Sequence, residues 1–151
     1  MVIARNTISV KSATFRKEAE AAAALSPGHM LIRDSDGKVK KHNISGGPGG
    51  ALFAMENDDL GDEVSTAYVS GDRVQFRAFQ KGDEVLCIIK DGEAIANGDW
   101  LVSAGDGTMM EATAESSGNY LEQIVLQALE AMDMSSSSGA DGDGYCYAEV
   151  V

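Results

Sequence analysis

The two histidines, His29 and His42, are the side chains in this sequence best suited to act as bases near neutral pH. His29 follows Pro27-Gly28 at an expected turn, and His42 stands beside Asn43 at the end of an expected strand. Neither has a serine or cysteine nucleophile in a recognisable local setting, which nucleophilic catalysis would need. We therefore predict that both histidines lie at the surface or at a strand edge. The chain is predicted to have no catalytic residues and not to be an enzyme.

Metal and redox chemistry also lack the residues that they need. Two histidines and two cysteines at these separations make no zinc site. Cys87 and Cys146 each lie in an apolar run, which favours two buried thiols, while the spacing alone leaves a disulfide open. Asp34–Gly37 and Asp141–Gly144 contain parts of a calcium-binding loop, but both lack a third oxygen ligand and the distal glutamate. We expect turns there, and neither a metal nor a cofactor.

Three further features favour structural roles. Gly46–Gly50 has no following Lys-Ser/Thr, so it is predicted to be a loop that does not bind phosphate. Trp100, the only tryptophan, is predicted to lie in the core. With 24 Asp and Glu residues, some carboxylates must lie close together, so a glycosidase-like pair is expected from composition alone. A small hydrolase stays open as an alternative, and it would require a pocket with convergent carboxylates of shifted pKa.

Charge is distributed unevenly along the chain. Residues 1–41 hold eight Lys/Arg against four Asp/Glu, whereas residues 42–151 hold four Lys/Arg against twenty Asp/Glu. Such an acidic body repels phosphate backbones, which argues against nucleic acid as a partner. No run approaches the roughly 18 apolar residues of a membrane-spanning helix, and the N-terminus lacks the apolar region of a signal peptide. We expect a soluble protein that binds no membrane.

Gly-Asp and Asp-Gly pairs punctuate the chain from Met30 onward and predict tight turns between short strands. Hairpins are expected around Asp34–Gly37 and Gly105–Gly107, and a closing strand over Tyr145–Val151. Strands at roughly ten-residue spacing predict an antiparallel β-barrel or β-sandwich. The expected fold is therefore mainly β, with at most one or two short helices.

Three segments are harder to assign. Ala13–Ala24 is rich in helix formers and predicts one short helix within an otherwise extended N-terminal arm, residues 1–24. Ile124–Glu130 has helical spacing, but Gln127–Ala131 echoes Phe53–Asn57, so we predict a strand. Ser135–Gly144 is a low-complexity loop.

The serial order of these motifs resembles the head-decoration (capsid cement) proteins of tailed bacteriophages, over roughly residues 25–151. The matching segments are Pro27-Gly28, Met30–Ile32, Asp36–Val39, Phe53–Asn57, Ala67–Val74, Lys81–Val85, Gly98–Leu101, Ser103–Gly107 and Ala128–Ala131. Each segment alone is a common turn or strand pattern, so the resemblance depends on their order.

This resemblance implies a small antiparallel β-barrel or β-tulip-like body with an extended N-terminal arm. It also implies a virion structural protein, made in the host cytoplasm, that binds the outer surface of the expanded capsid. It implies a homotrimer that stabilises contacts between major capsid protein subunits, with no active site. The division would be an arm, residues 1–24, and a decoration domain, residues 25–151. The residues predicted to contact capsid or neighbouring decoration subunits are Ile3, Arg5, Ile8, Val10, Phe15 and Arg16. The alternative is a carbohydrate- or ligand-binding β-barrel module of a virion, which would need exposed aromatic side chains.

Overall fold

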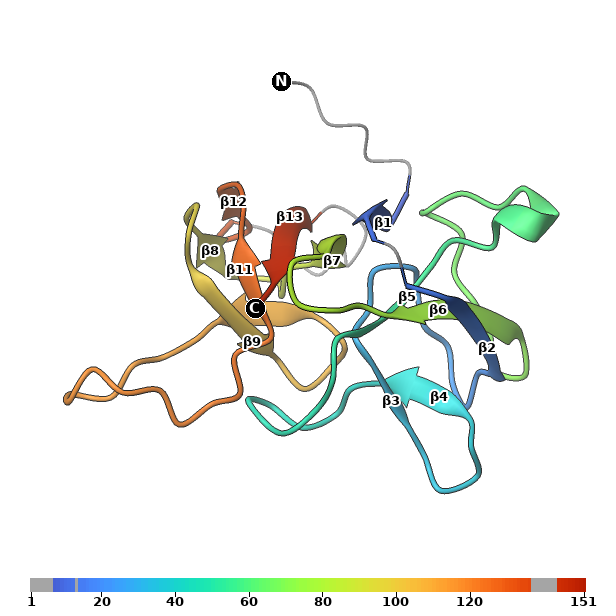
Figure 1. The fold of residues 1–151 in the computed structure, drawn as a ribbon, viewed down its shortest axis with the longest axis horizontal. Helices are drawn as coiled ribbons and strands as arrows, with labels where there is room; N and C mark the ends of the chain where they lie inside the picture. The colour runs from blue at the N-terminus through green and yellow to red at the C-terminus, as the bar shows by residue number, and fades with distance from the viewer. Residues whose placement is uncertain (1–6, 13, 137–143) are drawn as a thin grey trace.

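The structure is a computed structural model, which describes residues 7–12, 14–136 and 144–151. It is mainly β, as predicted, and one 3-10 turn, η1 (Asp58–Leu60), is the helical element of the described residues (Figure 1). The strands are β1 (Ser9–Lys11), β2 (Arg16–Glu20), β3 (Leu31–Arg33), β4 (Val39–Lys41), β5 (Leu52–Ala54), β6 (Arg73–Ala78), β7 (Glu84–Ile88), β8 (Ala94–Ile95), β9 (Trp100–Ser103), β10 (Met109–Glu111), β11 (Leu126–Ala128), β12 (Met132–Asp133) and β13 (Tyr145–Val150). A search of the same residues for a helix long and apolar enough to cross a membrane finds none.

The largest sheet has six strands in the order β1-β7-β13-β11-β9-β10. Its centre is the antiparallel pair β7 and β13, in register from Tyr145 opposite Ile88 to Glu149 opposite Glu84. A single parallel bridge, Ile89 to Met109, links the chain after β7 back to β10. One bridge is not a ladder, and β1 occupies the other edge of β7, so the sheet curls without closing. The predicted barrel is therefore an open arrangement of sheets.

A second unit consists of the three-stranded sheet β2-β6-β5 and the hairpin β3-β4. Two pairs of adjacent residues connect this unit to the first. In extended backbone, neighbouring side chains point to opposite faces, so one residue of each pair can pack into each core. Met30 and Phe53 pack into the main core, whereas their neighbours Leu31 and Ala54 pack into a smaller core. The smaller core contains Ala19, Ala21, Leu25, Leu31, Val39, Ala54, Tyr68, Val74 and Phe76. The segments that contain these pairs thus belong to both cores, which fixes the two units against each other.

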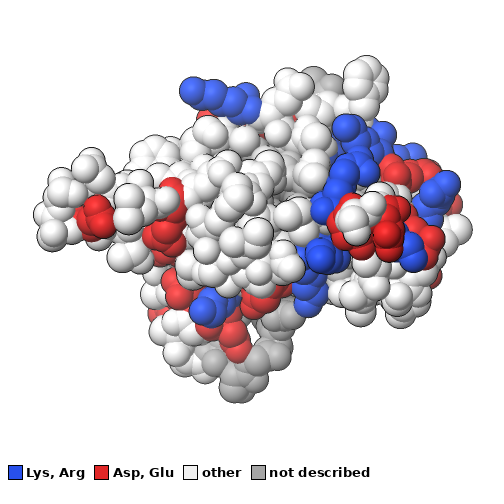
Figure 2. All heavy atoms as spheres, turned by 90° about the horizontal axis from the view of Figure 1, so that it is seen from below, with Lys and Arg blue, Asp and Glu red and all other residues white. Residues whose placement is uncertain are grey.

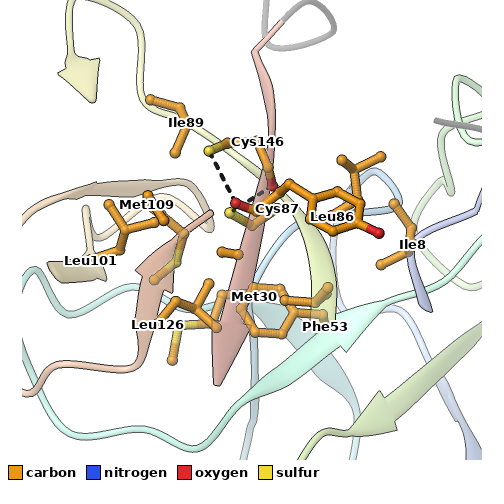
Figure 3. Close-up of a cluster of buried hydrophobic side chains, with 14 of the residues drawn as sticks. Ile8, Met30, Phe53, Leu86, Cys87, Ile89, Leu101, Met109, Leu126 and Cys146 are labelled. Atoms are coloured by element: carbon orange, nitrogen blue, oxygen red, sulfur yellow. Dashed lines mark hydrogen bonds between the residues drawn. The ribbon is translucent and has the colours of Figure 1, made fainter. Parts of the chain in front are cut away.

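The two cysteines lie directly opposite each other in β7 and β13, inside the main core (Figure 3). Both are buried thiols that form no disulfide with each other, which confirms the prediction. The Cys87 thiol lies 3.5 Å from the Cys146 carbonyl oxygen. Burial raises the pKa of Cys87 well above its ordinary value, so the thiol stays protonated and serves as a small apolar side chain.

Several local predictions are confirmed. The turns at Asp34–Gly37 and Gly105–Gly107 join the hairpins β3-β4 and β9-β10, and β13 is the closing strand. Gly37 has a φ of 77°, the left-handed conformation that such turns require. The predicted strand over Ile124–Glu130 is present as β11. Asp141–Gly144 and Ser135–Gly144 fall largely outside the described residues.

The helix predicted over Ala13–Ala24 is wrong, because Arg16–Glu20 forms strand β2 and pairs with β6. Ala19 and Ala21 are buried in the smaller core, beside the apolar face of β6. A ladder partner and a face to bury outweigh the modest helix preference of this segment. The core position predicted for Trp100 is also wrong, since its side chain is 37% exposed. It begins β9 and lies opposite the polar residue Gln127.

Candidate functional site

Both histidines are buried, so their predicted place at the surface or a strand edge is wrong. His42 Nδ1 lies 2.6 Å from Ser103 Oγ, and His42 Nε2 lies 2.8 Å from the Pro48 carbonyl oxygen. A carbonyl can only accept a hydrogen bond, so Nε2 carries the proton. Nδ1 is then the acceptor, and the Ser103 hydroxyl donates to it.

A serine donating to a histidine is the starting pair of nucleophilic catalysis, but this pair is enclosed. Ser103 is 1% exposed and His42 is 0% exposed. Ser103 Oγ also accepts a hydrogen bond from the Gly105 backbone N–H at 3.2 Å. A substrate carbonyl has no approach to a hydroxyl held in this way. The arrangement therefore fixes the loop between β4 and β5 to the end of β9 and the turn that follows it. We call it the His42 hub: His42, Pro48, Ser103 and Gly105.

The second histidine supports the same junction. His29 Nδ1 accepts a hydrogen bond from the Ser26 backbone N–H at 2.9 Å. Partial burial alone would raise the pKa of Asp106, but hydrogen bonds from Thr108, with His29 and Lys41 nearby, lower it. Asp106 thus stays ionised and holds the β9-β10 turn beside His29. The sequence did not show these groupings because Ser103 is 61 positions from His42.

The hub supports a second projecting segment, residues 112–123, which extends from the main sheet on the left of Figure 1. From here on, "the arm" means this segment and not residues 1–24. Gly46 donates its backbone N–H to the Ser103 carbonyl and accepts from the Gln123 N–H at 3.0 Å. The Gln123 side chain also donates to the Gly49 carbonyl at 2.9 Å. The glycine-rich loop, Gly46–Gly50, therefore connects the hub to the arm by hydrogen bonds. This gives a structural role to the segment that resembled a phosphate-binding loop in the sequence.

The arm ends in a tight turn and presents an apolar side chain to solvent. Ala114 and Tyr120 form an antiparallel bridge, and the Glu115 N–H donates to the Asn119 carbonyl at 2.8 Å. Leu121 is 80% exposed. Sequence reasoning missed this residue, because a single leucine near a Ser-Gly turn differs little from a core leucine.

The described part of the N-terminal segment is attached to the body by Glu56. Its carboxylate accepts the Ile8 backbone N–H at 3.0 Å and the Thr7 hydroxyl at 2.5 Å. Ile8 is fully buried in the main core, and Val10 packs against that core from a half-buried position. Of the predicted contact residues, Ile8 is therefore enclosed by its own chain. Ile3 and Arg5 lie outside the described residues.

Phe15 and Arg16 have the opposite surroundings. Phe15 is 87% exposed and borders a shallow pocket of about 250 Å³, lined by Thr14, Phe15, Lys17, Ala78 and Gln80. Arg16 forms ion pairs with Asp58 at 2.6 Å and with Asp59 at 3.2 Å, which join the η1 turn to β2. Strand β2 is also the edge of its sheet. Here the structure presents an exposed aromatic ring directly before a strand that is held by ion pairs, a surface suited to contact with another chain.

One carboxyl group shows the pKa shift that the hydrolase alternative requires. The pKa of Glu111 is raised, first by partial burial and then by the nearby carboxylates of Asp99 and Glu93. Glu111 lies exposed at the end of the edge strand β10. It lines neither the Phe15 pocket nor a second hollow of about 190 Å³ beside Tyr68.

No protein-family model matches the chain, and a search of curated proteins finds no match.

Proposed function

We propose that this chain is a virion structural protein that binds the outer surface of an expanded tailed-phage capsid. It stabilises contacts between major capsid protein subunits and works as a homotrimer without a catalytic centre or cofactor. One observation carries the proposal: a body with two buried cores presents two exposed apolar side chains, Phe15 next to β2 and Leu121 on the arm. Strand β2 and the arm lie at opposite sides of the body in Figure 1. A protein that bridges subunits needs at least two separate contact surfaces on a firm body.

The charge distribution supports a bridging role. Figure 2 shows most of the visible Lys and Arg side chains on the side of the β2-β6-β5 sheet, with Asp and Glu side chains among them, whereas the arm at the opposite side has glutamate as its only charged residue type. Surfaces of opposite sign select a partner's orientation and speed its approach more than they add affinity. The lysine and arginine side chains of the β2-β6-β5 side are therefore expected to contact acidic groups of a neighbouring subunit.

Sedimentation of the purified protein with capsids tests this function. Expanded and unexpanded capsids, assembled from the major capsid protein of the same phage, are each mixed with the protein and pelleted. We expect saturable co-sedimentation with expanded capsids and little with unexpanded ones, because the subunit contacts to be bridged form on expansion. Failure to bind either form would contradict the proposal. Substitution is preferable to deletion of residues 1–24, since Ile8 and Ala21 belong to the two cores.

A carbohydrate-binding virion module is the second candidate, and the exposure of Trp100 favours it. Tryptophan at a strand start with 37% of its surface exposed offers a ring on which a sugar can stack. A glycan array tests this candidate, with Trp100→Ala as the matched variant. Binding to a glycan that the variant loses would favour this function over capsid binding.

A further inference from the structure

We propose that copies of this chain associate head to tail, the arm of one copy docking on the Phe15 pocket of the next. This inference rests on the self-association that the proposed function includes, and it names the two surfaces. The donor face is Leu121 with Glu115. The acceptor face is Phe15 with Lys17 and Ala78.

The donor face combines an apolar tip with negative charge. Side chains alternate on either side of the Ala114–Tyr120 bridge, so Leu121 and Glu115 lie on the same side of the arm. Glu115 forms no ion pair with any residue that the structure describes. Residues 112–123 contain two glutamates, Glu115 and Glu122, and no lysine or arginine. The arm therefore offers an apolar contact with an unneutralised carboxylate beside it.

The acceptor face has the complementary composition. Phe15 and Lys17 are two positions apart along the β2 segment, so both point to the side on which Ala78 of β6 lines the same pocket. Lys17 is exposed and, within the described parts of the chain, has no ion-pair partner. The pocket of about 250 Å³ has room for a leucine side chain next to the Phe15 ring. Its lysine would lie near the incoming glutamate.

The placement of the two faces decides the kind of assembly. They lie on different sides of the main sheet, with the arm at the left and β2 at the right of Figure 1. One copy cannot join its own faces, so the contact is between unlike surfaces of two copies. Contacts of that kind close into a ring or extend into a filament. A single contact of this size is weak, and ring closure strengthens it because each copy is then held at both faces.

Sedimentation velocity over a concentration series, without capsids, tests the proposal on the full chain. The wild-type protein is expected to show a concentration-dependent oligomer. Leu121→Asp should raise the dissociation constant at least about tenfold, since it removes the apolar tip and adds a like charge to the arm. Val69→Asp is the matched control, because Val69 is 62% exposed and lies on neither face. The control should associate like the wild type.

A charge exchange tests the pairing of the two faces. Glu115→Lys and Lys17→Glu should each weaken association, and the double variant should recover most of the loss. Association of the wild type should also weaken as salt concentration rises. A double variant no better than the worse single variant would overturn the pairing.

The outcomes separate this inference from the proposed function. A wild-type protein that binds expanded capsids but stays monomeric at the highest concentration reached would overturn the inference and leave the function standing. Association that requires Leu121, with no binding to capsids, would support the inference and contradict the function. Equal loss of association in Leu121→Asp and Val69→Asp would also overturn the inference.

Discussion

Strands β7 and β2 are both five residues long, and their surroundings are opposite. Strand β7 lies between β1 and β13, and its residues Val85–Ile88 are all buried. Strand β2 lies at a sheet edge and buries only Ala19. Both are strands because a neighbour completes their hydrogen bonds. They differ in how much of each strand the rest of the protein covers. The covered strand, β7, stabilises the body, whereas the exposed edge strand, β2, can contact another chain.

The sequence of β2 also limits which chains can pair with its edge. Arg16, Lys17 and Glu18 place charge along the outer strand, and charged side chains discourage unplanned strand pairing. Arg16 uses its charge locally on Asp58 and Asp59. Contact at this edge is therefore expected through the side chains of Phe15 and Lys17, with β2 as a rigid support.

The largest predicted effect tests the β7 side of this comparison. Leu86 is 1% exposed in the main core, so Leu86→Ala should lower the free energy of unfolding by about 2–5 kcal/mol, from lost burial and a cavity. Lys17→Ala on β2 should change the same quantity by less than about 0.5 kcal/mol. Denaturant titration followed by circular dichroism measures both. Similar losses in the two variants would remove the distinction between the strands.

The second prediction concerns the His42 hub, which is buried like β7 and should therefore also contribute to the free energy of unfolding. His42→Ala leaves the Ser103 hydroxyl and the Pro48 carbonyl without their partner, which should cost about 1–3 kcal/mol. Hydrogen exchange at the Gly46 amide should quicken, because that amide bonds to Ser103 within the same junction. Lys40→Ala, on the neighbouring strand β4, is the control. Unchanged stability and exchange would mean that the hub does not hold the arm.

The turns of this fold could be predicted from the sequence, and its buried junction could not. The Asp36-Gly37 and Gly105–Gly107 segments specify tight turns through local backbone preference. The hairpins β3-β4 and β9-β10 were therefore predicted correctly. The helix over Ala13–Ala24 was predicted from local preference too, but the partner that decides the outcome, β6, lies about 57 residues further along the chain.

The candidate site shows the same limit. Phe15 and Arg16 were identified from their place in a basic, irregular segment, and the structure shows that one is exposed and the other ion-paired. Ile8 belonged to the same pattern, yet the Glu56 carboxylate, 48 residues away, holds it inside the body. Composition could not separate these residues, because burial depends on contacts between distant segments.

The third prediction concerns the inner face of the β2-β6-β5 sheet. Tyr68 is buried in the smaller core and donates to the Met55 carbonyl at 2.7 Å. Burial raises the pKa of Tyr68 from 10.0 to about 12. The folded protein therefore holds this proton more tightly than the unfolded chain does. Its contribution to stability is complete below pH 10 and is lost as pH rises toward 12.

Unfolding titrations at several alkaline pH values should show this decline. Tyr68→Phe should be less stable than wild type at pH 8, by about 1 kcal/mol for the lost hydrogen bond, and should lose less stability above pH 10. Some decline should persist, because burial also raises the pKa values of Cys87 and Tyr145. An equally steep decline in the variant would show that ionisation of Tyr68 is not the cause of the lost stability at alkaline pH.

The smallest effect on stability is expected at the exposed residue that precedes β2. Phe15 is 87% exposed, so Phe15→Ser should change the free energy of unfolding by less than about 0.5 kcal/mol. The same variant should bind expanded capsids and other copies of the chain more weakly than Val69→Ser, which removes an exposed apolar residue elsewhere. Denaturant titration and co-sedimentation give the two readings. If Phe15→Ser instead destabilised the protein as much as Leu86→Ala is expected to do, the Phe15 ring would stabilise the fold. Strand β2 would then not differ from β7 in being available for contact with another chain.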